Sequence, residues 1–153
     1  MPKLPSLILT ALLAASGLAG CNAPPPDTHP DQPVTKRKVI FKQMTRTLEP
    51  MGLVARERKD YQPEAFLASA QELAALAAQP WAHFPPDSNY PPSRALPAVW
   101  EKATDFKQAQ QDFQAATQQL IKAGEARDMA LIQKAVNTVQ DSCKACHDQF
   151  RRH

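Results

Sequence analysis

The stretch Cys143-Lys144-Ala145-Cys146-His147, close to the C-terminus, constrains this chain of 153 residues more than any other feature. Its spacing, C-x-x-C-H, is that of a c-type haem attachment sequence. The two thiols of such a sequence add across the vinyl groups of the porphyrin, and the histidine coordinates the iron. On a helix, Cys143 and His147 lie four residues apart and share one face. The sequence therefore predicts one covalent haem c, held by Cys143 and Cys146, with His147 as the axial iron ligand.

Two other kinds of site use similar residues. A thioredoxin-like C-x-x-C needs a βαβ setting, and no strand pattern lies near the motif. A structural zinc site needs four ligands with paired spacings, and the chain has no second C-x-x-C and no H-x₃-H. Both alternatives are therefore weaker than haem attachment.

Residues 1–20 have the pattern of an export signal. Lys3 supplies a positive start, and an uncharged, mostly apolar run follows from Leu7 to Ala19. This run is shorter than the roughly 20 residues that a helix needs to span a bilayer. It ends in Leu18-Ala19-Gly20-Cys21, which resembles a bacterial lipobox. We expect Cys21 to be diacylated and to become the new N-terminus; the alternative is an ordinary signal peptide with an incidental cysteine.

Residues 21–34 are predicted to join the lipidated Cys21 to the domain as a tether. Five prolines occur between Asn22 and Val34, so the segment should be extended and should hold the domain roughly 40 Å from the lipid. His29 lies in it and is expected to be solvated. Asn22 follows the cysteine where an aspartate often signals inner-membrane retention, which favours the outer membrane. The haem domain, residues 35–153, is then expected in the periplasm or at the cell surface.

Apolar residues repeat at helical spacing in four segments. The first runs from Thr35 to about Arg58, with Pro50 predicting a kink or an early end. The second begins at Pro63 and ends before Pro80, and a long proline-rich connection follows it. The third runs from about Thr104 to Ala123, closed by Gly124 as a C-cap. The fourth begins after Asp128 as N-cap, and its apolar stripe comprises Ile132, Val136, Val139, Cys143, Cys146 and Phe150.

These four segments predict an all-α, antiparallel four-helix bundle. Because both haem cysteines lie on the apolar stripe of the last helix, the bundle should enclose the haem.

Formal charge is only +3, from 18 basic and 15 acidic side chains, and nothing indicates a nucleic-acid partner.

The sixth position of the iron needs a separate interpretation. Only six residues follow His147, and none is methionine, so a methionine ligand has to come from upstream: Met44, Met51 or Met129. If Phe41 faces the iron instead, the pocket is apolar. Water and anions lose their hydration in such a pocket, whereas NO and CO lose little.

The four-helix pattern, the C-terminal Cys143-Lys-Ala-Cys-His147-Asp-Gln-Phe-Arg151 segment, Pro80-Trp81-Ala-His-Phe84 and Arg37-x-x-x-Phe41-x-x-Met44 together resemble a cytochrome c′. The resemblance covers about residues 35–152. It implies a left-handed bundle that forms a homodimer through its first two helices, and a high-spin, five-coordinate haem.

The resemblance also implies roles for single residues. Phe41 shields the sixth site, Arg37 holds a haem propionate, and Arg151 lies beside the proximal histidine, where the family binds or gates NO. Lys38 stands where many members have glutamine next to that propionate. The other residues expected around the haem are Met44, Trp81, Phe84 and Phe150.

Two functions follow as hypotheses. The first is a haem protein that binds NO and CO, limits nitrosative stress and exchanges electrons with an unspecified redox partner. The second is a low-spin electron carrier with Met44 as the sixth ligand. An enzyme such as a haem peroxidase needs polar distal groups, and the sequence places none there.

Overall fold

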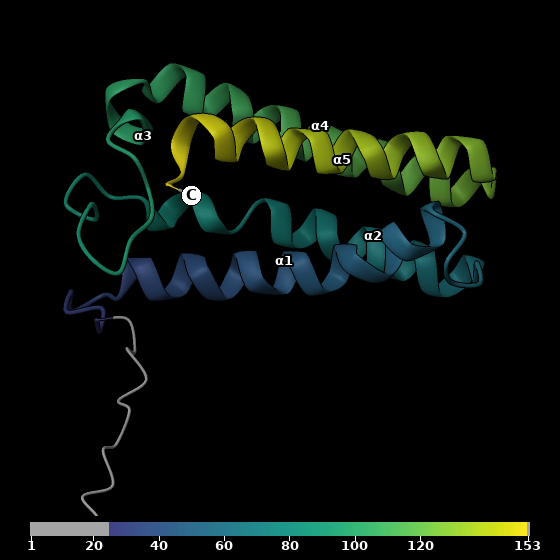
Figure 1. Ribbon diagram of the computed structural model, residues 1–153, viewed down its shortest axis with the longest axis horizontal. Helices are drawn as coiled ribbons and strands as arrows, with labels where there is room; N and C mark the ends of the chain where they lie inside the picture. The colour runs from purple at the N-terminus through teal and green to yellow at the C-terminus, as the bar shows by residue number, and fades with distance from the viewer. Residues whose placement is uncertain (1–24, 153) are drawn as a thin grey trace, which may run out of the picture.

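The computed structural model describes residues 25–152, and four long helices form a bundle within it (Figure 1). The signal peptide and Cys21 lie outside the described residues. The helices are α1 (Pro33–Ala55), α2 (Pro63–Ala77), the 3₁₀ helix η1 (Pro80–His83), α3 (Ala98–Glu101), α4 (Ala103–Ala126) and α5 (Met129–Phe150). Within residues 25–152 the only β pairing is an isolated bridge between Ala95 and Arg151. The predicted all-α four-helix fold is confirmed.

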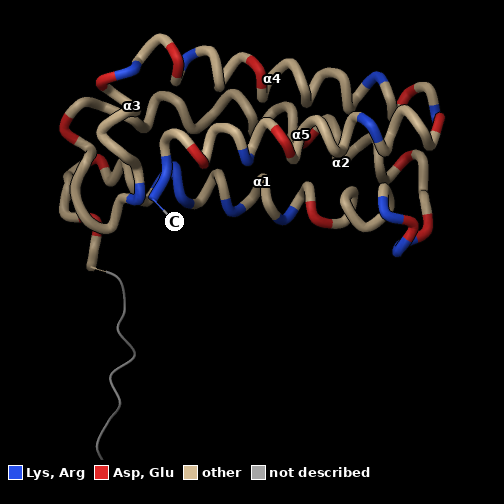
Figure 2. The backbone as a smooth tube through the Cα atoms, turned by 45° about the horizontal axis from the view of Figure 1, so that its top comes forward, with Lys and Arg blue, Asp and Glu red and all other residues tan. Residues whose placement is uncertain are grey.

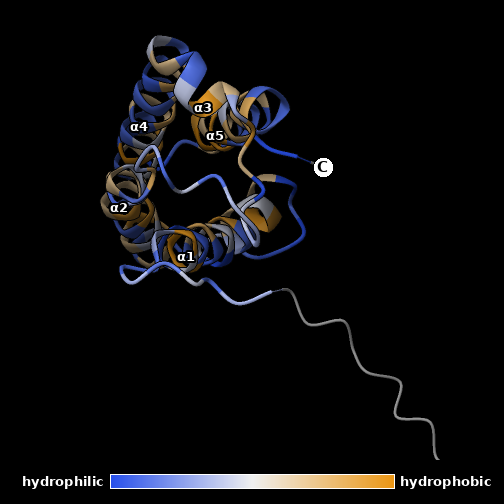
Figure 3. Cartoon of the chain, turned by 90° about the vertical axis from the view of Figure 1, so that its left-hand side faces the viewer, coloured by the Kyte–Doolittle hydropathy of each residue, from blue (hydrophilic) through white to orange (hydrophobic). Residues whose placement is uncertain are grey.

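The core lies along the shared axis of α1, α2, α4 and α5, which surround it in the end view (Figure 3). Each predicted apolar stripe contributes to it. The fully buried side chains include Leu73 of α2, Leu120 of α4 and Ile132, Val136 and Val139 of α5. Helical periodicity was sufficient to find these residues, because each helix of a bundle has to bury one apolar face.

The early end predicted at Pro50 is wrong. Pro50 lies inside α1, which continues to Ala55. Proline removes one backbone hydrogen bond from a helix interior. Met51 and Val54, on the turn after it, are buried in the core. Their burial stabilises this last turn of the helix despite the missing bond.

Gly124 is not the C-cap of α4, as the sequence suggested. The helix ends at Ala126, and Arg127 caps it with a left-handed φ of 54°. Gly124 is instead buried against α2, where an added Cβ would lie 3.4 Å from the Phe66 ring. A methyl group at this position would be in van der Waals contact with α2, and the backbone of Gly124 is not left-handed. Asp128 is the N-cap of α5 as predicted, because its carboxylate accepts the Leu131 N–H at 3.1 Å.

The N-terminal segment differs from the extended tether that the sequence predicts. Its residues from Asp27 to Gln32 contact the bundle. The Asp27 carboxylate accepts the Tyr90 hydroxyl at 2.5 Å and the Thr35 N–H of α1 at 2.7 Å. His29, expected to be solvated, stacks on Tyr90 and lies 3.2 Å from Asp87. The described residues 27–32 are therefore not part of an extended tether.

The connection between η1 and α4 packs over the end of the bundle. Trp81 and Phe84 contact Phe106 of α4, with ring centroids 6.0 and 5.2 Å apart, and Phe106 contacts Phe150 of α5 at 5.2 Å. Backbone pairing fixes the chain end to the same loop, since Leu96 donates to the Phe150 carbonyl and Arg152 to that of Arg94.

In the described part of the chain, no helix is long and apolar enough to cross a membrane.

Candidate haem site

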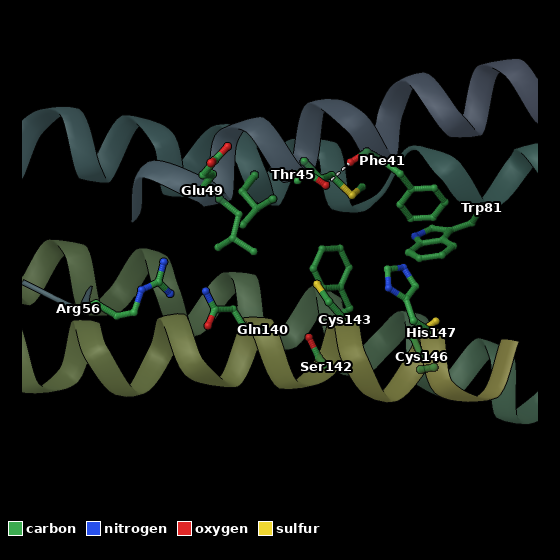
Figure 4. A pocket seen from close by; sticks show the side chains of 15 residues that line it. Phe41, Thr45, Glu49, Arg56, Trp81, Gln140, Ser142, Cys143, Cys146 and His147 are labelled. Atoms are coloured by element: carbon green, nitrogen blue, oxygen red, sulfur yellow. Dashed lines mark hydrogen bonds between the residues drawn. The ribbon is translucent and has the colours of Figure 1, made fainter. Parts of the chain in front are cut away.

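A cavity of about 460 Å³ lies between α1 and α5 and is the centre of the candidate site (Figure 4). Its size is in the range of small-molecule and cofactor pockets. Side chains from all four long helices and η1 line it: Phe41, Met44, Thr45, Leu48, Glu49, Arg56, Leu73, Trp81, Ala109, Phe113, Gln140, Ser142, Cys143, Cys146 and His147. The cavity therefore contains both predicted haem cysteines and the predicted iron ligand.

The α5 wall presents the attachment sequence as predicted. Cys143, Cys146 and His147 are partly buried and face the cavity from the last two turns of the helix. Burial raises the pKa of both thiols to about 11, and for Cys143 the neighbouring Cys146 adds to the effect. Neutral thiols suit an apolar cavity wall, where a thiolate would be poorly solvated.

The opposite wall is aromatic. Figure 4 shows Phe41 of α1 and Trp81 of η1 at the end of the cavity where His147 lies. The Phe41 ring packs edge-on against Trp81, with centroids 6.0 Å apart, and against Phe84 at 6.5 Å. The Trp81 indole N–H donates to the Ala77 carbonyl at 2.7 Å, which fixes the indole. Phe41 is thus held across the cavity from His147 by two further rings.

Met44 lines the same cavity from one turn further along α1 and is only 6% exposed. The cavity hydroxyls are engaged with backbone: Thr45 donates to the Phe41 carbonyl at 3.0 Å and Ser142 to the Val139 carbonyl at 2.7 Å. The charged liners Glu49 and Arg56 lie with Gln140 toward the other end (Figure 4). The region that faces His147 is therefore apolar.

Arg37 is buried and its guanidinium is held by the loop after η1. One terminal nitrogen donates to the His83 carbonyl at 2.7 Å and to the Ser88 hydroxyl at 2.8 Å. The other donates to the Ser88 carbonyl at 2.9 Å and to the Ser93 hydroxyl at 2.7 Å. These bonds use all four terminal N–H groups, so Nε–H is the remaining donor. The propionate contact of Arg37 stays a prediction.

The guanidinium of Arg37 also lies over the Phe84 ring, with its central carbon 4.4 Å from the ring centroid. Burial lowers the pKa of Arg37, and the coulombic attraction of Tyr90 and Asp27 opposes this shift. An arginine remains protonated under these conditions. Arg37 therefore connects the start of α1 to the loop that carries Phe84.

The other predicted contacts lie around the cavity. Phe150 is buried in the aromatic cluster, and Cys146 packs against that cluster. Arg151 is exposed, and its backbone N–H donates to the His147 carbonyl at 3.1 Å. Lys38 is exposed on α1. Propionate and NO contacts of these last two residues stay predictions.

Sequence reasoning did not assign several residues that build the site. Leu73 and Phe113 line the cavity, and both lie in segments whose apolar residues repeat at helical spacing. Ser88 and Ser93 hold Arg37, but they occur in an irregular loop without a periodic signal. Only the folded chain brings these hydroxyls to a residue about 50 positions away.

The residues present fit a haem c. One wall of a partly open, largely apolar cavity carries two thiols at C-x-x-C spacing and an adjacent imidazole, and the Phe41 and Trp81 rings lie across from the imidazole. When bound, the haem supplies an iron that coordinates a sixth ligand and changes oxidation state. The protein provides the covalent attachment, the axial ligand and a dry environment.

Comparisons with known proteins agree with this site. The family model described as Cytochrome C' matches residues 32–151. The chain is 33% identical over 123 residues to cytochrome c' from Alcaligenes xylosoxydans xylosoxydans, covering 80% of this chain and 95% of the relative.

Solved structures give the same result. A nitric oxide complex of a point variant of cytochrome c prime from Alcaligenes xylosoxidans superposes with a TM-score of 0.77 at 32% identity, covering 84% of this chain and 100% of that one. A carbon monoxide-bound variant from the same organism also superposes with a TM-score of 0.77 at 32% identity, with the same coverage. The chain therefore belongs to the cytochrome c′ family and carries one covalent haem c.

Proposed function

We propose that this protein binds NO and CO at a high-spin, five-coordinate haem iron, takes part in electron transfer, and limits nitrosative stress. The observation that carries the proposal is the apolar wall opposite His147, formed by Phe41 and the rings packed on it. Such a wall offers no hydrogen bond to water or an anion, so these ligands would lose hydration without compensation. NO and CO have little hydration to lose.

Four residues of the chain have separate roles in this proposal. His147 supplies the single protein ligand, and Cys143 and Cys146 keep the haem from dissociating. Phe41, across the cavity from His147, would exclude water from the sixth position of a bound haem iron. The solved relatives in complex with nitric oxide and with carbon monoxide support this assignment.

A catalytic role such as peroxide cleavage receives no support from the cavity. Cleavage of an O–O bond needs a polar distal group. The hydroxyls of Thr45 and Ser142 donate to backbone carbonyls of their own helices. The charged liners lie away from the end that holds His147.

Absorption and electron paramagnetic resonance spectra of the oxidised, reduced and NO-exposed protein test the proposal. We expect high-spin iron in the resting protein and a new spectrum when NO or CO is added to the reduced form. A low-spin resting spectrum with methionine ligation would contradict it.

The second candidate is a low-spin electron carrier, favoured by the position of Met44 in the same cavity. The variant Met44→Ala separates the two functions. If Met44 is the sixth ligand, the variant becomes high-spin; if Phe41 covers the iron, the spin state does not change. Met51, also buried and on the same helix, provides a matched control as Met51→Ala.

Membrane attachment and assembly complete the proposal. Diacylation of Cys21 would anchor the protein to the outer membrane, with the haem domain in the periplasm or at the cell surface. Two molecules would associate through α1 and α2, and the 55% exposed Val39 on α1 supports this, because a large apolar side chain gains from being covered.

A further inference from the structure

The first two thirds of α1 are strongly basic. Residues 33–48 contain Lys36, Arg37, Lys38, Lys42 and Arg46 and no acidic residue. The first turn of the helix has no carboxylate either. Because the positive end of a helix dipole disfavours cations, this composition costs stability. Helix formation therefore does not explain why this segment carries five cations.

A second group of cations lies at the end of α5. Arg94 donates from Nε to the Arg152 carbonyl at 3.0 Å, Arg152 donates its N–H to the Arg94 carbonyl at 2.8 Å, and Ala95 pairs with Arg151. This backbone pairing brings three arginines together. Their proximity is visible in Arg151, whose pKa is lowered by burial and then by the charge of Arg94.

These two groups are neighbours. Arg37 of α1 donates to the Ser93 hydroxyl at 2.7 Å, and Ser93 directly precedes Arg94. The start of α1 and the end of α5 therefore meet at this loop, and Figure 2 shows Lys and Arg positions at this end of both helices. Lys38, Lys42, Arg94, Arg151 and Arg152 are exposed, and within residues 25–152 none of them is ion-paired to a carboxylate. We refer to these five residues as the basic face. Of the nearby acids, Asp148 is paired with Lys144, and Asp87 lies against His29.

The basic face borders the haem cavity. On α1, Lys38 is three residues before Phe41 and Lys42 three residues before Thr45, and both Phe41 and Thr45 line the cavity. On α5, Arg151 follows the axial ligand His147 by one turn, a rise of about 5.4 Å. Charges at this distance act on the iron site within a Debye length of about 8–10 Å.

From this arrangement we propose that the basic face is the docking surface for an acidic redox protein, and that electrons enter and leave the haem there. The inference rests on the proposed electron transfer and adds the kind of partner. One electron crosses the interface in each encounter, and the iron and the partner's redox centre change oxidation state in opposite directions. No proton or covalent bond has to move.

The local charge differs from the charge of the whole domain. Residues 25–152 contain 17 basic and 15 acidic side chains, and 17 − 15 gives +2. Two haem propionates would reduce this to about zero. The reactions of a near-neutral molecule depend little on salt, whereas a local basic face raises the association rate with anionic partners at low salt. The two cases are therefore distinguishable by kinetics.

The test uses two small one-electron oxidants of opposite charge. Stopped-flow mixing follows oxidation of the ferrous holoprotein by hexacyanoferrate(III), an anion, and by tris(phenanthroline)cobalt(III), a cation, at several ionic strengths. We expect the anion to react faster at low salt and to slow down as salt is added, and the cation to show the opposite trend.

The variant Arg94→Glu/Arg152→Glu should lower the low-salt rate with hexacyanoferrate about tenfold, within the usual range of electrostatic steering. The control Lys122→Glu/Lys134→Glu makes the same change in net charge at exposed positions. Lys134 lies near the other end of α5, about 25 Å away, so this control should leave the rate nearly unchanged. Because Arg94 has a backbone contact, the single variants Arg152→Glu and Lys134→Glu provide a second matched pair.

Equal effects of the two charge changes, or no salt dependence, would overturn the inference. A second contrary outcome combines two results: the anionic and cationic oxidants react with the same salt dependence, and vesicles of phosphatidylglycerol bind the parent protein but not the arginine variant. The basic face would then bind the membrane and not a redox protein. The CO spectrum of each variant is an independent check. If the parent protein does not bind CO, the proposed function is refuted. If all variants bind CO and the arginine variant is oxidised as fast as the parent protein, only the docking role of the basic face is refuted.

Discussion

Replacing Arg37 with leucine should destabilise the protein by releasing the loop of residues 83–93 from α1. Arg37 is 3% exposed, and its guanidinium makes four hydrogen bonds of 2.7–2.9 Å to this loop. The family resemblance assigns Arg37 a different task, a contact with a haem propionate. The substitution therefore separates a structural role from a cofactor role.

The magnitude follows from the contacts that are lost. A hydrogen bond to a charged group contributes about 1.5–3 kcal/mol, so four contribute about 6–12 kcal/mol. Removing the cation also removes its desolvation cost, which is several kcal/mol. The Ser88 hydroxyl keeps a bond to the Pro85 carbonyl, and the Ser93 hydroxyl keeps the Ala95 N–H. The net loss should be about 3–5 kcal/mol, or about 10–20 °C in melting temperature.

Urea unfolding of the haem-bound protein, followed by circular dichroism, measures this change. Arg46→Leu removes an exposed cation from the same helix and serves as the control, with an expected change within about 0.5 kcal/mol. Ser93→Ala removes one acceptor of Arg37 and should cost about 1–2 kcal/mol. The reduction potential is measured in parallel.

A loss below about 1 kcal/mol for Arg37→Leu would refute the reasoning from the loop contacts. If the reduction potential then changed and Ser93→Ala had no effect, the propionate contact would be the main task of Arg37. A large loss shared with Ser93→Ala would establish the loop role.

Three further predictions concern other parts of the domain. Gly124→Ala should raise the free energy of unfolding by up to about 1 kcal/mol, because the position is helical and the added Cβ, 3.4 Å from the Phe66 ring, would be in van der Waals contact with it; a loss in urea unfolding would show instead that α4 and α2 need the glycine for their close approach. Desolvation acts to raise the pKa of Asp27, but hydrogen bonds from Tyr90, Thr35 and His29 outweigh it and lower the pKa to about 2. Its stabilisation is therefore present above pH ~4 and is lost as the pH falls toward 2; Tyr90→Phe should move acid unfolding to higher pH, and an unchanged acid titration by circular dichroism would contradict this. Val39→Asp should convert the proposed dimer into a monomer, which sedimentation velocity would detect.

The helices were predictable because each has to bury one face. Their apolar stripes repeat at helical spacing, and a local pattern of this kind survives any arrangement of the rest of the chain. Pro50 and Gly124 were misinterpreted for the converse reason. Their local preferences, helix breaking and capping, were overruled by burial of Met51 and by close packing against Phe66.

The attachment of haem was determined by five consecutive residues, because the chemistry of two thiols and an imidazole depends on their local spacing. The sequence by itself also determined that Cys143 and Cys146 face a core, since they continue the stripe of the last helix.

Tertiary structure alone decided what surrounds that motif. It placed Phe41 across the cavity from His147 and gave Arg37 four hydrogen bonds to three residues of a segment that shows no periodicity. It also brought Arg94 to Arg152, 58 positions away, and placed Ser93, next to Arg94, against Arg37 of α1. Such contacts join segments far apart in the chain. Their energies come from desolvation and charge in the folded state, and a local pattern does not encode them.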